Sequence, residues 1–471
     1  MSRTIRSAVV FAAVLVVGLA SAPSWAGTET PAPCPSSKTT ETVVPGLQHH
    51  VLCRGTVATE PSYRVLVGTF HKQSEASTRL EELRKEGFAV LPDSDGEDYR
   101  ILTVAVPTRA EAEQVRDRLA ERGFGGELEI LQVVQDLDNP SGPWRIHVLE
   151  ADPNTVRIRV AHAMDAAIGL ETTADLAARH GALAAVNGGF FHMTGLLAGD
   201  CDGTLQIDGR LLSEPDRGRG TVGFYDSDGR VHAVFGRLSF TGESRLEGGA
   251  TIPLDGVNRA REPEEVILYT PEFHRTTLTR PGGAEVLLED GRITAIREGL
   301  GSSPIPPGGA VLSIGEERAR EIARKLRPGM TIEIRTDVVP LLPDPDGEWG
   351  KVRFMSSAGP LLLWNGTRFA EPATESISAV FYLARHPRTA VGAKKDGTIL
   401  LVTVDGRRPD DSVGMTIPEL TDLMLELGCT SAVNLDGGGS TTMVVRDQIV
   451  NHPSSSSGPR RNGDGVLVFA R

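Results

Sequence analysis

Hydrophobic and polar residues follow a repeated order over residues 62–135. The segment YRVLVGTF, beginning at Tyr63, alternates like a β-strand, and SEASTRLEELRKEGF places Ala76, Leu80 and Leu83 on one helical face before Gly87. After the short strand AVL, the order recurs as a strand YRILTVAV, a helix TRAEAEQVRDRLAERGF and a strand LEILQVV. The pattern predicts a small βαββαβ domain of the ferredoxin-like type.

Beyond residue 139 the pattern of hydrophobic and polar residues changes. Glycine-rich turns separate many short apolar runs, and few helices are predicted. One helix is marked in GMTIPELTDLMLELGC, where Thr416 and Glu419 have capping-box spacing and an apolar stripe comprises Leu420, Leu423, Met424 and Leu427. A second runs from Thr172 to Gly181. We therefore expect an α+β protein, with the small domain followed by a larger mixed α/β domain over residues 144–471.

Each of these two helices is followed by the phrase Gly-x-x-x-Ala-Val-Asn, at 181–187 and at 428–434. Both copies end at an asparagine before glycines, namely Asn187 with Gly188 and Gly189, and Asn434 with the segment LDGGGS. The repetition indicates two helix-to-strand units, and neighbouring strands would bring the two asparagines together. Chance similarity is the alternative, since Ala, Val and Gly are common residues.

The segment AVNLDGGGSTTMVV is the strongest candidate for chemistry. Three glycines behind a carboxylate let the backbone approach a ligand closely and turn several N–H groups into one concavity suited to an anion. The residues concerned are Asn434, Asp436, Gly437, Gly438 and Gly439, with Ser440 and Thr441 as hydroxyl donors. A tight hairpin is the plainer interpretation, but it requires Asp-Gly and not three glycines.

A second group of polar residues lies in RHPRTAVGAKKDGTILLVTVDGRR, which predicts two strands joined by a turn. Arg388 and Thr389 lie ahead of the first strand, and Asp405 and Arg407 lie at the end of the second, buried strand. An arginine can bind phosphate or carboxylate through two parallel hydrogen bonds, while an aspartate can act on an acetal carbon or a proton. A single arginine beside a turn is usually solvated. The prediction that these arginines belong to a site therefore rests on their clustering with the glycine-rich segment.

The N-terminus predicts export. Arg3 and Arg6 precede a short apolar run and a small-residue ending at Ala26, which is typical of a signal peptide over residues 1–26; a membrane anchor is the alternative. Residues 27–61 are rich in Thr, Pro and Ser and predict a linker. Because exported thiols tend to oxidise, we expect two disulfides, Cys34 to Cys53 and Cys201 to Cys429.

Composition narrows the function. With 471 residues, 39% hydrophobic and 24% charged, the chain has enough apolar residues for more than one domain core. The formal net charge of −13 disfavours electrostatic binding to nucleic acid or to anionic membranes. The acidic turn Asp344, Asp346 and Glu348 offers oxygen ligands for calcium but lacks a dedicated loop pattern, so no metal or other cofactor is expected.

The small domain, from Ser62 to Val134, resembles the SPOR family of peptidoglycan-binding domains in its Val-x-Val-Gly-x-Phe opening and its order of elements. This resemblance implies peptidoglycan as a partner. The motif is loose, and a structural module without a ligand fits the same residues.

The larger domain resembles the phosphodiester glycosidase family, on the motifs NGGFF, RHPRTAVG, VDGRR, MTIPELTDLMLELG and NLDGGGSTTMVV in that order. The resemblance runs from Trp144 to Arg471, with a poorly matching middle at 230–345 that is expected to be an insertion. It implies an enzyme that removes a sugar linked through its anomeric carbon to phosphate. It also implies that the segment after the glycine turn borders the pocket. Ser454, Arg460 and Arg461 are therefore further, weak candidates for ligand contacts.

On this reading, Asp436 and Asp405 are the catalytic candidates, with their individual roles left open. The expected substrate and phosphate ligands are Asn187, Gly188, Gly189, Arg388, Thr389, Arg407, Asn434, Gly437, Gly438, Gly439, Ser440 and Thr441. We expect a secreted hydrolase acting on envelope or extracellular phosphoglycans. The alternatives are a non-catalytic glycan-binding protein of the cell wall and an exopolysaccharide-assembly factor.

Overall fold

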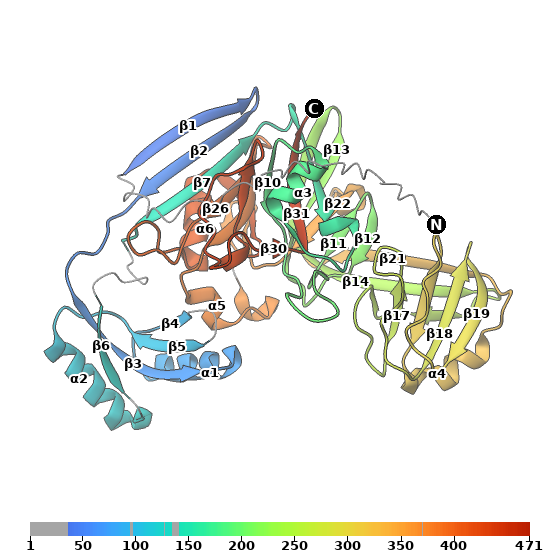
Figure 1. Ribbon diagram of the computed structural model, residues 1–471, viewed down its shortest axis with the longest axis horizontal. Helices are drawn as coiled ribbons and strands as arrows, with labels where there is room; N and C mark the ends of the chain where they lie inside the picture. The colour runs from blue at the N-terminus through green and yellow to red at the C-terminus, as the bar shows by residue number, and fades with distance from the viewer. Residues whose placement is uncertain (1–35, 95–97, 127, 134–140, 370) are drawn as a thin grey trace, which may run out of the picture. The chain divides into compact units, whose positions relative to one another are not determined.

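The computed structural model describes residues 36–94, 98–126, 128–133, 141–369 and 371–471 (Figure 1). The predicted βαββαβ domain is confirmed, as β3 (Ser62–Phe70), α1 (Gln73–Lys85), β4 (Val90–Ser94), β5 (Tyr99–Thr103), α2 (Arg109–Leu119) and β6 (Glu129–Val133). Its sheet has the order β4-β5-β3-β6, which is the split-βαβ arrangement. The Thr108 hydroxyl accepts a hydrogen bond from the N–H of Glu111, and the Glu111 carboxylate accepts one from the Thr108 N–H, so α2 begins with a capping box.

The larger domain is built around a sheet with the order β1-β2-β7-β26-β25-β27-β23-β24. Its strands are β1 (Ser37–Val44), β2 (Leu47–Arg54), β7 (Trp144–Ala151), β26 (Ile399–Val404), β25 (Arg388–Lys394), β27 (Cys429–Asn434), β23 (Leu361–Trp364) and β24 (Thr367–Arg368). Alternate residues of β26 enter two separate apolar clusters, Leu400 and Val402 on one face and Leu401 on the other. Burial of both faces explains why this strand reads as the unbroken apolar run ILLVTV.

The prediction of a linker is wrong for residues 37–54. Every residue of β2 pairs with β7 in antiparallel register, from Leu47 with Ala151 to Arg54 with Trp144, and β1 pairs with β2 (Figure 1). The small domain therefore lies in the chain between two strands that are neighbours in one sheet. Local composition missed the strands because their stabilisation comes from a partner about ninety residues away in the sequence.

A second sheet of the larger domain supplies much of the candidate site. It has the order β29-β28-β10-β31-β8, with β29 (Gln448–Ile449), β28 (Met443–Val445), β10 (Ala184–Asn187), β31 (Asp464–Ala470) and β8 (Val156–His162). The two repeated phrases end in β10 and β27, which lie in different sheets, so the two strands are not neighbours. The asparagines consequently take different partners, as described below.

The middle of the chain forms two further sheets. One contains β12 (Arg210–Ser213), β11 (Leu205–Ile207), β22 (Phe354–Ser357), β13 (Gly220–Ser227), β14 (Arg230–Leu246) and β15 (Thr251–Pro253), with β21 (Ile332–Pro340) paired to β14. The other contains β16 (Gly256–Val257), β17 (Val266–Tyr269), β20 (Ala310–Ile314), β18 (Ala284–Glu289) and β19 (Arg292–Glu298). The second of these sheets and α4 (Glu316–Ile322) share an apolar cluster with β14, β15 and β21, within the stretch expected to be an insertion.

The marked helices form as expected. In α6 (Ile417–Glu426), the Thr416 and Glu419 capping box is present, and Leu420, Leu423 and Met424 are buried against the large sheet. Burial of each such side chain stabilises the fold by about 1.5–3 kcal/mol. Helix α3 (Thr173–His180) begins after Thr172 and ends at Gly181, whose φ of 65° is the left-handed conformation that favours glycine.

The predicted signal peptide and Cys34 lie outside the described residues, so export and the pairing of Cys34 with Cys53 stay predictions. Among the described residues, no helix is long and apolar enough to cross a membrane. The pairing of Cys201 with Cys429 is wrong, because both are buried free thiols. Cys201 packs in the apolar cluster on one face of the large sheet and Cys429 in the cluster on the other.

Candidate active site

The glycine-rich turn follows β27 and is anchored to neighbouring strands. The Leu435 N–H donates to the Thr389 carbonyl (2.8 Å), and the Asp436 N–H donates to the Gly188 carbonyl (3.0 Å). These two bonds place the turn against β25 and the end of β10. The two sheets therefore meet at Asp436.

The glycines are required mainly for close packing. The Gly437 N–H donates to the Asp436 carboxylate (2.8 Å) and the Gly438 N–H to the Pro387 carbonyl (2.9 Å), so these two donors are already used within the protein. A side chain at Gly437 would clash with the Pro387 carbonyl, and one at Gly439 would clash with the Arg460 guanidinium. The expected concavity of free N–H groups is thus reduced, and the turn instead admits cationic side chains.

Asp464 is a second carboxylate at the same place, and sequence reasoning missed it. It begins β31, and its two oxygens accept hydrogen bonds from the Gly189 N–H and the Ser356 hydroxyl, both at 2.9 Å. Gly188 lies so close to this carboxylate that any side chain there would overlap it. The only sequence signal is an Asp-Gly pair beside an apolar strand, a pattern that Asp436 shares.

The two carboxylates are coupled electrostatically. Burial and, to a smaller extent, the charge of the nearby Asp436 raise the pKa of Asp464 to about 6, while the hydrogen bonds from Ser356 and Gly189 oppose the rise. Burial likewise raises the pKa of Asp436 to about 6, against the hydrogen bond from Ser440 and the charge of Arg460. A pair of carboxylates that ionise near pH 6 can divide acid and base roles.

Two arginines flank the turn from the other side. The Arg407 guanidinium lies 3.3 Å from the position that a Cβ on Gly438 would occupy, and the Arg460 guanidinium lies against Gly439. Among the described residues no hydrogen-bond partner is found for the buried Nε of Arg407. Burial lowers the pKa of Arg407 and the neighbouring Arg460 lowers it further, so two cations share a poorly solvated space suited to an anion.

Asn187 and Thr389 hold this site together from behind. The Asn187 carbonyl accepts from the Thr389 hydroxyl (2.7 Å) and the Thr442 N–H (3.2 Å), and its amide donates to the Asp436 carbonyl (2.8 Å). Asn187 is fully buried, so these bonds join the two sheets. The polar groups of Asn187 and Thr389 are used for positioning the turn.

Two other expected ligands also lie in the interior. Arg388 is fully buried and donates to the carbonyls of Met415, Phe381 and Ala384, and burial lowers its pKa to about 9. Asn434 donates to the Gly359 carbonyl at 2.7 Å, whereas its buried carbonyl oxygen has no hydrogen-bond partner among the described residues.

Of the remaining polar candidates, Ser440 lies at the site and the others have structural partners or are buried elsewhere. The Ser440 hydroxyl lies 3.4 Å from the Arg460 guanidinium, at the site, while that of Thr441 is buried and finds no partner within the described segments. Asp405 is fully buried and accepts hydrogen bonds from Asn451 and from the backbone of His452. In the acidic turn, Asp344 accepts from the N–H groups of Glu348 and Trp349, which gives its carboxylate a structural use.

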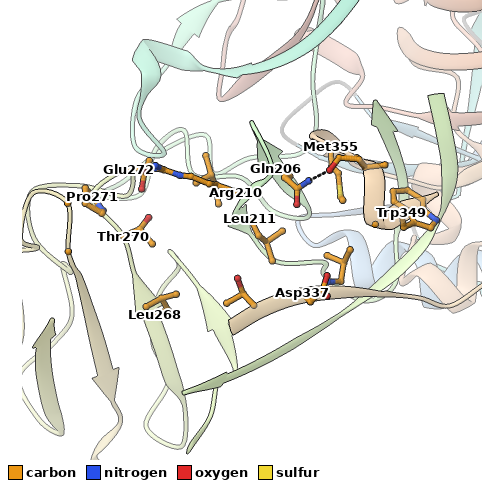
Figure 2. A pocket seen from close by; sticks show the side chains of 18 residues that line it. Gln206, Arg210, Leu211, Leu268, Thr270, Pro271, Glu272, Asp337, Trp349 and Met355 are labelled. Atoms are coloured by element: carbon orange, nitrogen blue, oxygen red, sulfur yellow. Dashed lines mark hydrogen bonds and ion pairs between the residues drawn. The ribbon is translucent and has the colours of Figure 1, made fainter. Parts of the chain in front are cut away.

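A cavity of about 620 Å³ lies beside β22, and Figure 2 shows the side chains that line it. Met355 lines it, whereas the adjacent Ser356 donates to Asp464. Gln206, Trp349 and the ion-paired Arg210 and Glu272 also line it. None of the predicted site residues does, so its walls do not contribute to the site described above.

Two protein-family models match this chain. Residues 278–469, which include Arg407, Asp436, Arg460 and Asp464, match the family model of the phosphodiester glycosidases. This chain carries a phosphodiester glycosidase domain. Residues 59–128 match the model of the SPOR domain, so the small domain is a SPOR domain.

Two relatives each match a short stretch of this chain. The chain is 43% identical over 70 residues to the SPbeta prophage-derived protein YomE of Bacillus subtilis. It is 37% identical over 67 residues to the N-acetylglucosamine-1-phosphodiester alpha-N-acetylglucosaminidase of Bos taurus. These matches span 15% and 14% of this chain but only 11% and 12% of the relatives.

A solved structure resembles almost the whole chain. It is a crystal structure of a protein from Burkholderia pseudomallei, with 27% sequence identity and a TM-score of 0.69, and the match covers 94% of this chain and 98% of that one. The arrangement of a SPOR domain with a phosphodiester glycosidase domain therefore has a fold-level counterpart.

Proposed function

We propose that this chain is an exported hydrolase that releases a sugar from a sugar-1-phosphodiester. The observation that carries the proposal is the pairing of Asp436 with Asp464 beside Arg407 and Arg460. Family membership of the domain supports hydrolysis in general, and the relative from Bos taurus acts, by its name, on an N-acetylglucosamine-1-phosphodiester. N-acetylglucosamine is therefore the first sugar to test.

The chemistry follows from the charges. As the bond between the anomeric carbon and the phosphate oxygen breaks, positive charge develops on the sugar, and an ionised carboxylate stabilises or attacks that carbon. The phosphate monoester departs with the bonding electrons, and Arg407 and Arg460 stabilise its negative charge. Water then adds to the sugar and loses a proton to a carboxylate. Because a phosphate monoester is a good leaving group, its protonation contributes less than in an ordinary glycosidase.

The SPOR domain and the predicted signal peptide suggest where the reaction occurs. We propose that the SPOR domain binds peptidoglycan and keeps the enzyme in the cell envelope or in the extracellular wall, where phosphoglycans are the substrates. Co-sedimentation of the mature chain with purified sacculi tests this part, and recovery of the protein only in the supernatant would contradict it.

The decisive assay uses an N-acetylglucosamine α-1-phosphodiester in water enriched in ¹⁸O, with the chain from Gly27 onward. Cleavage at the anomeric carbon gives free sugar carrying the label and an unlabelled phosphate monoester. We expect Asp436→Asn and Asp464→Asn to lower kcat/KM by about 10²–10⁴-fold. Asp396→Asn, at an exposed turn, is the matched control and should retain activity.

Other outcomes separate the alternatives. Label in the phosphate and release of sugar 1-phosphate would show cleavage at phosphorus and refute the glycosidase mechanism. Tight binding of this and other sugar-1-phosphodiesters without turnover would instead support a glycan-binding protein.

A further inference from the structure

A group of potential metal ligands lies apart from the carboxylate pair. Oxygens of Asp405 and Asp411 and a ring nitrogen of His452 all lie within 4.8 Å of one another. The His452 Nδ1 is 3.1 Å from the Asp411 Oδ2 and 3.7 Å from the Asp405 Oδ2. Both carboxylates are fully buried, and the His452 side chain is 32% exposed, which leaves a route from solvent.

An independent observation points into the same group. His147, on β7, is only 3% exposed, and its Nε2 lies 3.7 Å from the Asp405 Oδ2. This nitrogen is buried and has no hydrogen-bond partner in the described part of the chain. The other ring nitrogen, Nδ1, is 3.1 Å from the His49 Nε2. His147 is not one of the residues whose ligand atoms all lie within 4.8 Å of one another, so it is an outer partner beside Asp405 and not a further ligand.

The charges favour a cation here. Arg145 compensates Asp411 and donates to its Oδ1 at 2.6 and 3.0 Å and to its Oδ2 at 3.2 Å, and the same Oδ2 lies 3.1 Å from the His452 Nδ1. Asp405 receives hydrogen bonds from the Asn451 amide and the His452 N–H but contacts no arginine or lysine in the described residues. A buried carboxylate without a matching cation is costly, and a bound metal ion removes that cost.

We propose that Asp405, Asp411 and His452 bind one divalent transition-metal ion of the zinc type, whose fourth position is open to water. One imidazole and two carboxylates form a nitrogen and oxygen set that Zn²⁺ accepts, whereas Ca²⁺ and Mg²⁺ favour oxygen ligands alone. Arg145 orients Asp411 and His147 lies beside Asp405, as outer partners do in known zinc sites.

The ion would tie together two segments that are distant in sequence, the loop after β26 and the segment at 451–452. Asn451 also donates to the Thr441 carbonyl, directly after the glycine turn. The ion therefore stabilises the wall of the candidate active site without being needed for the carboxylate chemistry. This inference does not depend on the proposed function.

The test is metal binding by the mature chain after removal of metals with a chelator. Zn²⁺ is titrated in competition with a chromophoric chelator, and Co²⁺ is used as a spectroscopic substitute. We expect one equivalent of Zn²⁺, a four-coordinate Co²⁺ spectrum without thiolate bands, and a rise in the unfolding midpoint with Zn²⁺. His452→Ala and His147→Gln should each weaken binding by at least about 10–100-fold. His192→Ala, at an exposed loop, should bind like the wild type.

Two results would overturn the proposal. One is less than half an equivalent of bound Zn²⁺ in the wild type. The other is unchanged affinity in both histidine variants, which would assign the ion to surface histidines or to the thiols of Cys201 and Cys429. Asp411→Asn is avoided because it removes the partner of Arg145, and circular dichroism of the two histidine variants verifies that they are folded.

Discussion

Asp464→Asn should stabilise the folded protein at neutral pH although it lowers turnover. The asparagine has the shape of the aspartate, so its oxygen can accept from the Gly189 N–H and its amide can donate to the Ser356 hydroxyl. The substitution thus preserves both hydrogen bonds and removes only a buried negative charge beside Asp436.

The magnitude follows from the pKa. The pKa of Asp464 is raised from 3.8 to about 6, chiefly by burial. Between about pH 4 and pH 6 the folded state therefore holds a proton that the unfolded state has lost, and the wild type loses stability as the pH rises. A shift of about 2 pKa units corresponds to about 3 kcal/mol, all of it lost above pH 6. The variant lacks this loss.

The assay is urea unfolding of the wild type and of Asp464→Asn at pH 4 and pH 8, followed by fluorescence and circular dichroism. The advantage of the variant in free energy of unfolding should grow by up to about 3 kcal/mol between the two values. Asp396→Asn is the control, because the N–H of Thr398 lowers the pKa of that exposed carboxylate and no such gain is expected.

A difference that does not change with pH, or a variant less stable than the wild type at pH 8, would refute the reasoning. The first result would mean that the pKa of Asp464 is the same in the folded and unfolded states, and the second that the fold stabilises the ionised form. The charge of Asp464 beside Asp436 would then not lower the free energy of unfolding.

Three further predictions test other parts of the site. Arg407→Gln should raise KM for a sugar-1-phosphodiester by about 10–100-fold, because it removes one to two charge-assisted hydrogen bonds. Arg446→Gln, remote from the turn, is the control and should leave KM unchanged. If the two variants have equal kinetics, Arg407 is not part of the site. Asn187→Ala should lower the free energy of unfolding by about 2–4 kcal/mol in urea titrations, because it leaves buried donors and acceptors unpaired. Without reductant, alkylation should label Cys201 and Cys429 only after unfolding, and a disulfide between them in peptide mass spectra would contradict the structure.

The sequence by itself determined the local structure and the kind of chemistry. Capping boxes at Thr108 and Thr416, the strand and helix order of the SPOR domain and the glycine turn behind Asp436 all depend on residues a few positions apart. Short-range hydrogen bonding and periodic burial encode such features directly, so they could be predicted without a partner strand.

Only the tertiary structure decided which distant groups meet. Asp464 joins Asp436 because β31 and β10 pair beside the turn, and no spacing in the sequence indicates that contact. Cys201 and Cys429 lie in apolar clusters on opposite faces of the large sheet, and Arg388 is buried in the core. Strand β2 pairs with β7 although its composition is that of a linker. These outcomes depend on strand order and on which face of a sheet each residue occupies, and both are settled by packing across the whole domain.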